Sequence, residues 1–127
     1  MKVGIATQEL TRIDAALGAA RHLMLFEVSA EGIANLGIAS FEPAGRPGGH
    51  HERLAPRLEA LEGCALVFVA DVGPDGEGAL ASRHITPLRR FAGKPIADAL
   101  DAVQNGLRRN SSRWLRLAEQ GERRRDR

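Results

Sequence analysis

The sequence is poor in the residues on which several kinds of function depend. Its 127 residues include one cysteine, one tryptophan and no tyrosine. A single thiol, that of Cys64, forms no internal disulfide and is too little to build a zinc or iron–sulfur cage. The shortage of aromatic side chains disfavours binding of single-stranded nucleic acid by base stacking. Any metal cluster bound here would therefore be a guest and not a built-in part.

Long apolar runs are also missing from the sequence. No segment approaches the roughly 20 apolar residues of a membrane-spanning helix, and residues 1–5 lead into a strand-like segment without the features of a signal peptide. We therefore expect a cytoplasmic protein with no membrane partner. The length and the 43% hydrophobic content suit one domain with a single core.

Charge is spread unevenly along the chain. The formal net charge is +2, but residues 108–127 hold eight arginines against three acidic residues. We therefore expect a main domain at residues 1–107 and a basic C-terminal helix or tail at residues 108–127. Such a tail suits an anionic partner, and it equally suits a solvated, frayed terminus.

Apolar patterning predicts five strands. Two of them are joined by a turn of hairpin length at residues 29–32, which makes them antiparallel. A continuous apolar run at residues 65–72 predicts a strand buried on both faces at the centre of the sheet. Pro87, followed by exposed arginines, predicts an edge strand. The strands are expected at residues 2–7, 23–28, 33–41, 65–72 and 87–91.

Helical spacing of apolar residues predicts the remaining elements. Helices are expected at residues 50–61, 79–84 and 95–107, and from Ser111 onward. The resulting order, β-β-β-α-β-α-β-α-α, predicts an α/β fold with a mixed five-stranded sheet flanked by helices. Ligands on such sheets bind at the carboxyl ends of strands, which here are the loops after Thr7, Val72 and Phe91.

Several motifs follow one another along the chain. They are Leu61-Glu62-Gly63-Cys64-Ala65-Leu66-Val67, the glycine loop from Gly73, Ile85-Thr86-Pro87-Leu88, Pro95-Ile96 and Trp114-Leu115. In order and spacing they resemble the dinitrogenase iron-molybdenum cofactor biosynthesis family, from residue 2 to about residue 118, and the last two resemble its NifX branch most. The resemblance implies a ribonuclease H-like fold. It also implies a non-catalytic carrier that holds the iron-molybdenum cofactor or its iron–sulfur precursor and works with nitrogenase cofactor assembly proteins.

The first loop departs from the family pattern. Members typically carry Asp-x-His-Phe-Gly after the first strand, whereas this chain has Asp14-Ala15-Ala16-Leu17-Gly18. Ala16 thus stands where the family has its most obvious ligand. If this chain binds a cluster, other residues must supply the ligand.

An iron–sulfur cofactor is a large anion with exchangeable positions, so its carrier needs cations, free backbone N–H groups and an imidazole or soft ligand. His50 and His51, at the entry of a predicted helix, are the first candidates as metal ligands. The alternative is an ordinary polar helix start. His22, eight residues after Asp14, is a weaker candidate, and His84 is expected to be incidental.

Other residues are candidates to supply positive charge and backbone N–H donors to an anionic cofactor. Arg12 and Arg21 flank the first loop and can face an anion. Gly73, Gly76 and Gly78 lie in a predicted loop whose N–H groups can receive one. The alternative is a flexible turn whose acidic residues cap the next helix. Cys64 is expected to be a buried apolar residue and not a ligand.

Two rival functions stay open at this point. A ribonuclease H-like sheet suggests a metal-dependent nuclease, but that chemistry needs converging carboxylates. The first strand has none, and Asp71 is a lone candidate. The other rival is an accessory factor that binds nitrogenase assembly proteins and has lost cofactor affinity through the altered Ala16 loop.

Overall fold

The computed structural model describes residues 1–41 and 50–109, with side chains from residue 53 onward in the second segment. The glycine-rich loop predicted at residues 43–49 and the helix predicted from Ser111 lie outside the described residues. Most of the predicted basic tail lies outside them as well. The order of the strands and helices that are described agrees with the predicted order.

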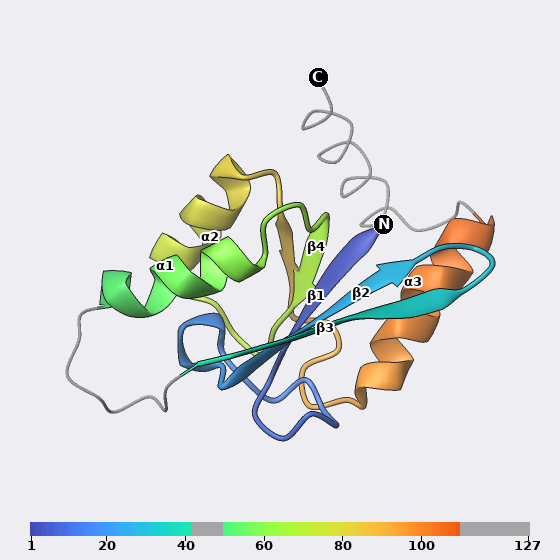
Figure 1. Cartoon of the computed structure of the whole chain (residues 1–127), viewed down its shortest axis with the longest axis horizontal. Helices are drawn as coiled ribbons and strands as arrows, with labels where there is room; N and C mark the ends of the chain where they lie inside the picture. Colours follow the sequence, from blue (N-terminus) through green and yellow to red (C-terminus); the bar gives the residue numbers. More distant parts are fainter. Residues whose placement is uncertain (42–49, 110–127) are drawn as a thin grey trace.

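Five strands form one mixed sheet (Figure 1). They are arranged in the order β3-β2-β1-β4-β5, with β2 antiparallel to both neighbours and β4 and β5 parallel to β1. The predicted α/β fold with a mixed five-stranded sheet flanked by helices is confirmed. The strands are β1 (Lys2–Thr7), β2 (His22–Val28), β3 (Ile33–Ser40), β4 (Leu66–Phe68) and β5 (Thr86–Leu88).

The apolar run at residues 65–72 is not the long central strand that was predicted. β1 occupies the centre of the sheet, and β4 lies between β1 and β5 with only three residues. After Phe68 the backbone changes its partner: Ala70 N–H donates to Ala15 O at 2.9 Å, in the loop beyond β1. The residues after Phe68 therefore stay largely buried, although they no longer belong to the regular hydrogen-bonded strand. β5 is the edge strand predicted from Pro87, although it starts at Thr86 and ends at Leu88.

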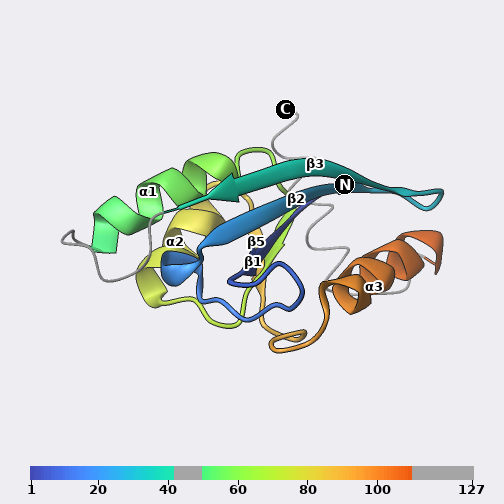
Figure 2. The same ribbon diagram turned by 60° about the horizontal axis from the view of Figure 1, so that its bottom comes forward.

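Helices cover both faces of the sheet. α1 (His50–Ala60) and α2 (Pro74–Ser82) lie together on one side, and α3 (Ile96–Arg109) lies on the other, below the β2–β3 hairpin in Figure 2. A single 3-10 turn, η1 (Leu17–Ala19), precedes β2. No helix among the described residues is long and apolar enough to cross a membrane.

Two helix boundaries differ from the predictions. α2 starts at Pro74 and not at Ala79, because a proline in the first turn and the acids Asp75 and Glu77 favour a helix start. The interpretation of residues 73–78 as a loop is therefore wrong, and Gly76 and Gly78 are helical. α3 continues to Arg109, so the expected domain boundary after residue 107 falls inside this helix.

Each face of the sheet has its own hydrophobic cluster. β1 divides its side chains between them: Val3 and Ile5 face α3, while Gly4 and Ala6 face α1 and α2. The small residues on the second face let α1 approach closely, since a Cβ at Gly4 would collide with the side chain of Leu61. Both clusters are centred on β1 and β4.

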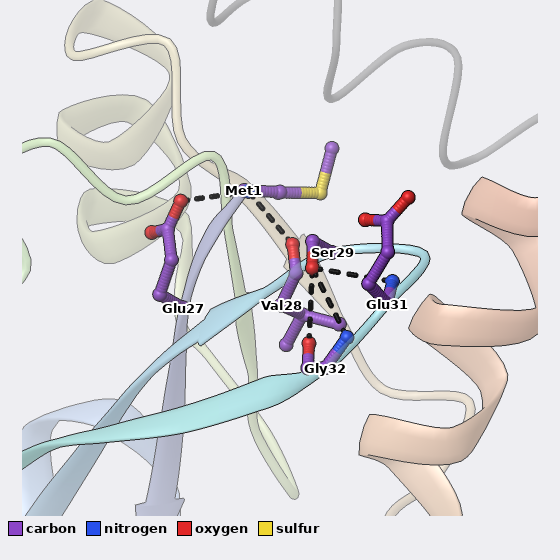
Figure 3. A network of polar contacts seen from close by, with 6 residues as sticks. All are labelled: Met1, Glu27, Val28, Ser29, Glu31 and Gly32. Carbon is purple, nitrogen blue, oxygen red and sulfur yellow. Dashed lines mark hydrogen bonds and ion pairs between the residues drawn. The ribbon is translucent and has the colours of Figure 1, made fainter.

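Polar contacts fix the end of the sheet where β1 begins (Figure 3). The Met1 amino group donates to Glu27 Oε1 at 3.1 Å and to Val28 O at 2.8 Å. In the β2–β3 turn, Ser29 Oγ accepts from the N–H groups of Glu31 and Gly32 at 3.3 and 3.1 Å. The candidate ligand-binding loops lie at the opposite end, where β1 and β4 finish.

Candidate ligand-binding site

The loop after β1 is held by Asp14. Its Oδ1 accepts a hydrogen bond from the Gln8 N–H at 2.7 Å and from Thr7 Oγ1 at 3.3 Å. Thr7 is fully buried, and its hydroxyl also accepts from the Leu10 N–H at 3.0 Å. The aspartate of the motif therefore organises the loop.

The rest of the motif runs beside the chain that leaves β4. Ala16 forms a parallel bridge with Asp71, and the Leu17 N–H donates to Asp71 O at 3.0 Å. Leu17 is fully buried in the cluster under α1 and α2. Together with the Ala70 bond to Ala15, these contacts fix the position of the motif relative to the sheet.

An open hollow of about 220 Å³ lies against this motif. Its walls come from three segments: the loop and turn at residues 16–19, the first half of α1, and the link between β4 and α2. These segments meet at the carboxyl end of β4, which is where ligands are expected on a sheet of this kind. The lining residues are Ala16, Leu17, Gly18, Ala19, Arg53, Asp71, Val72 and Gly73.

Arg53 gives the hollow a cationic wall. Its Nε atom is buried and has no hydrogen-bond partner, the only such side-chain atom among the described residues. Buried donors are nearly always paired, and leaving one unpaired costs about 1–3 kcal/mol. The unmet donor therefore marks a place where a ligand acceptor would be stabilising.

Arg57 lies one helical turn further along α1 and is almost completely buried. It is only 3% exposed, and its Nε and Nη2 donate to Ala20 O at 3.1 and 2.7 Å. Its guanidinium lies 4.6 Å from the centre of the Phe41 ring. Burial lowers the pKa of Arg57, and the nearby positive charge of Arg53 lowers it further. Arg57 thus ties α1 to the end of η1.

Carboxylates near the hollow are paired with Arg89. Arg89 Nε lies 3.2 Å from Asp71 Oδ1, and its Nη2 lies 2.7 Å from both Glu77 Oε1 and Val72 O. The pKa of Asp71 is lowered by the hydrogen bond from the Val72 N–H and then by that from Arg89. The pKa of Arg89 is raised by Glu77 and then by Asp71. One arginine therefore offsets two negative charges that would repel an anion.

Of the predicted site residues with described side chains, only Gly73 lines the hollow. His22 is the first residue of β2, and its Nδ1 lies 2.8 Å from Ser40 Oγ. Arg12 donates from Nη1 to Gly93 O at 3.1 Å, on the way to α3. Arg21 is exposed and pairs through its backbone with Gln8 and Phe41. These three are not gathered around the hollow.

The remaining glycines have other surroundings. Gly76 is buried, and a Cβ there would lie 2.7 Å from Val72 Cγ2, so the position needs glycine for packing of α2. Gly78 is exposed, with no atom within 4 Å of such a Cβ. Cys64 is fully buried, as expected.

His50 and His51 are the first two residues of α1. They precede Arg53 by three and two residues, within one turn of the helix that supplies the cationic wall. Within the described part of the chain, no group of three or more His, Cys, Asp and Glu residues is placed to hold a metal ion. This finding leaves the two histidines as predictions.

Arg53 was not among the site residues predicted from the sequence. Its signal was present: Arg53 and Arg57 stand four residues apart beside the apolar stripe of Leu54 and Leu58. Two arginines flanking the buried face of a helix are unusual, because arginine is rarely buried without a partner. Such a pattern indicates a binding site.

The fold and the hollow define a class: a small α/β protein with a mixed sheet and an open, arginine-walled site beside the first loop. The profile of the family described as dinitrogenase iron-molybdenum cofactor matches residues 1–106. The chain therefore belongs to this family, in its NifX branch, as its motifs predicted. This membership connects it with biosynthesis of the nitrogenase cofactor.

Known proteins agree with this assignment. Protein NifX of Herbaspirillum seropedicae is 37% identical over 120 residues, which cover 94% of this chain and 82% of that protein. Protein NifX of Rhodobacter capsulatus is 32% identical over 91% of this chain and 76% of its own length. The crystal structure of PH0822 superposes with a TM-score of 0.63 at 19% identity, covering 84% of this chain and 90% of that one, and supports the fold alone.

Proposed function

We propose that this protein is a non-catalytic carrier that holds the iron-molybdenum cofactor or an iron–sulfur precursor in the hollow beside Ala16. In this role it passes the guest between nitrogenase cofactor assembly proteins. One observation carries the proposal: the loop that corresponds to the family motif forms one wall of the hollow, and an arginine with an unmet buried donor forms another.

The chemistry of the hollow suits such a guest. Arg53 offers positive charge, and Ala16 offers apolar contact. At about 220 Å³ and open to solvent, the hollow would cover only part of a bulky cluster. The uncovered part stays accessible to the next protein, which is what a carrier requires. A ligand for iron or molybdenum would come from His50 or His51, at the start of the helix that bears Arg53.

Loading under exclusion of oxygen tests the proposal directly. The full chain is mixed with isolated iron-molybdenum cofactor, passed through a desalting column, and analysed for iron and molybdenum per protein. We expect both metals to co-elute with the protein. No uptake at high excess of cofactor would contradict the carrier function.

Two variants and a control sharpen this experiment. H50A/H51A should release the cofactor faster than wild type, and A16H, which restores the motif histidine at the wall of the hollow, should release it more slowly. H84N is the matched control, since asparagine tolerates the positive φ of 59° at that position. Equal off-rates in H50A/H51A and wild type would remove both histidines from the site.

The second candidate is an assembly factor that binds protein partners and no cofactor. It is favoured by edge strand β3, whose Ile33, Leu36 and Ile38 are 39%, 50% and 47% exposed. The eight residues of β3 include no charged side chain, the usual protection of an edge against pairing. Complex formation with assembly proteins that is independent of cofactor, together with failed loading, would favour this function.

A further inference from the structure

The unmet donor of Arg53 calls for a particular kind of ligand atom. All other buried side-chain nitrogen and oxygen atoms in the described part of the chain have a hydrogen-bond partner. The backbone carbonyl of Arg53 is engaged by Arg57 Nη1 at 2.7 Å, so the helix around Arg53 is well tied. What stays unmet is the buried Nε–H of an arginine that lines the hollow, and the preferred acceptor of a guanidinium N–H is an anion.

The charges around the hollow favour an anion as well. The hydrogen bonds of Arg57 go to the carbonyl oxygens of Ala20 and Arg53, which leave its positive charge in place. Arg89 already pairs with the carboxylates of Asp71 and Glu77. Asp75, in the first turn of α2, adds a third carboxylate near Gly73. Among the described residues neither Arg53 nor Arg57 forms an ion pair, so the uncompensated positive charge lies on α1.

The N-terminus of α2 adds backbone donors on the opposite wall. Its N-cap residue, Gly73, has no side chain to cap the helix, and it lines the hollow. Pro74 has no N–H, so the first turn offers the N–H groups of Asp75 and Gly76, which bear partial positive charge. This helix end would not make a site by itself, but here it faces the same hollow as the unmet Arg53 donor.

We infer that Arg53 is the anion-recognition residue of the hollow, and that its Nε donates to an anionic atom on the outside of the guest. This inference rests on the proposed function and names how the guest is recognised: through a sulfide or a carboxylate oxygen, in addition to any bond to the metal. Such recognition needs no ligand atom at position 16, where this chain has alanine.

Two small probes separate the possible anionic groups. Tetrathiomolybdate presents only sulfide, and citrate presents carboxylates and a hydroxyl group. Binding of each to the full chain is measured by calorimetry at low salt for wild type, R53Q, R53K and R83Q. Arg83, exposed at the end of α2, is the matched control.

We expect wild type to bind at least one probe and R53Q to bind it about 10- to 100-fold more weakly, the loss typical of a hydrogen bond to a charged group. R53K should show an intermediate loss because lysine keeps the charge without the planar N–H geometry. R83Q should match wild type. The probe whose binding depends on Arg53 identifies the group, sulfide or carboxylate. Binding of neither probe, or equal affinities in R53Q and wild type, would overturn the inference.

Cofactor loading of the same variants separates this inference from the carrier function. If wild type and R53Q retain the cofactor equally, the role of Arg53 falls and the carrier function stands. If wild type binds a probe through Arg53 but takes up no cofactor, the carrier function falls and the anion site stands. Thermal unfolding of each variant, compared with R53K, shows whether a loss of binding reflects loss of the fold.

Discussion

The two faces of the sheet differ in what they bury. The face under α3 buries a large aliphatic and aromatic cluster that includes Val3, Phe68 and Val103. The face under α1 and α2 is also rich in aliphatic residues, but it accommodates the guanidinium of Arg57 and borders the hollow. Burying polar groups costs free energy unless they are bonded. The face under α3 therefore contributes mainly to stability. The face under α1 and α2 both contributes to the core and borders the candidate site.

Residue size on β1 accounts for part of this difference. The large Val3 and Ile5 fill the space toward α3, whereas Gly4 and Ala6 leave room for α1. Close approach of α1 lets Arg57 reach the carbonyl of Ala20 and places Arg53 beside the loop at residues 16–19. The alternation of large and small residues on one strand thus positions a site on only one face.

Removing a large side chain from the apolar face should give the largest loss of stability. Phe68 is fully buried and contacts Phe91 edge to face, with ring centres 5.6 Å apart. Phe68→Ala should lower the free energy of unfolding by about 3–5 kcal/mol, measured by denaturant titration. The folded fraction should keep its affinity for the anionic probe. A matching loss of affinity would show that the two faces are coupled.

Removing the buried guanidinium from the other face should cost less. Arg57→Met leaves Ala20 O without its two donors, and an unsatisfied buried carbonyl costs about 1–3 kcal/mol. Relief of repulsion from Arg53 offsets part of that cost. Hydrogen exchange should show faster exchange of the Ala19 and Ala20 amides than in wild type, while Arg83→Met leaves them unchanged. Unaltered exchange in Arg57→Met would mean that this arginine does not hold the loop.

Periodic patterns predicted most of the fold. Apolar spacing located α1 and α3, and the hairpin turn at residues 29–32 correctly joined β2 to β3. The length of β4 was not predictable in this way, because its limit is set by a change of backbone partner from β1 to Ala15. The start of α2 was misjudged because its glycines outweighed Pro74 and the first-turn acids.

The candidate site was less predictable than the fold. The hollow lies beside the loops after β1 and β4, two of the three loops predicted to bind ligands, and Gly73 lines it. Arg53 was not predicted, because its place at the hollow depends on three segments far apart in sequence that meet only in the folded chain. The burial of Arg53 Nε without a hydrogen-bond partner cannot be predicted from the residues around it in the sequence.

Two glycines in α2, Gly76 and Gly78, should have smaller effects on stability. In Gly76→Ala the new methyl group would meet Val72 Cγ2 at 2.7 Å. Overpacking of this kind costs about 1–3 kcal/mol, more than the gain of up to about 1 kcal/mol from replacing a helical glycine. We therefore expect a net loss of roughly 1 kcal/mol in thermal or denaturant unfolding. If Gly76→Ala stabilised the protein, the side chain of Val72, which lines the hollow, would have to move aside at little cost in free energy.

Gly78→Ala should have the smallest effect and the opposite sign. A Cβ at Gly78 meets no atom within 4 Å, and the residue is exposed in the interior of α2. Alanine should therefore stabilise the protein by about 0.5–1 kcal/mol, with no change in affinity for the anionic probe or in cofactor retention. The expected neutrality follows because Gly78 does not line the hollow, although its sequence context suggested an anion-binding loop. If Gly78→Ala weakened binding, the guest would have to extend beyond the hollow along α2, and the site would be larger than the residues around Arg53 and Ala16.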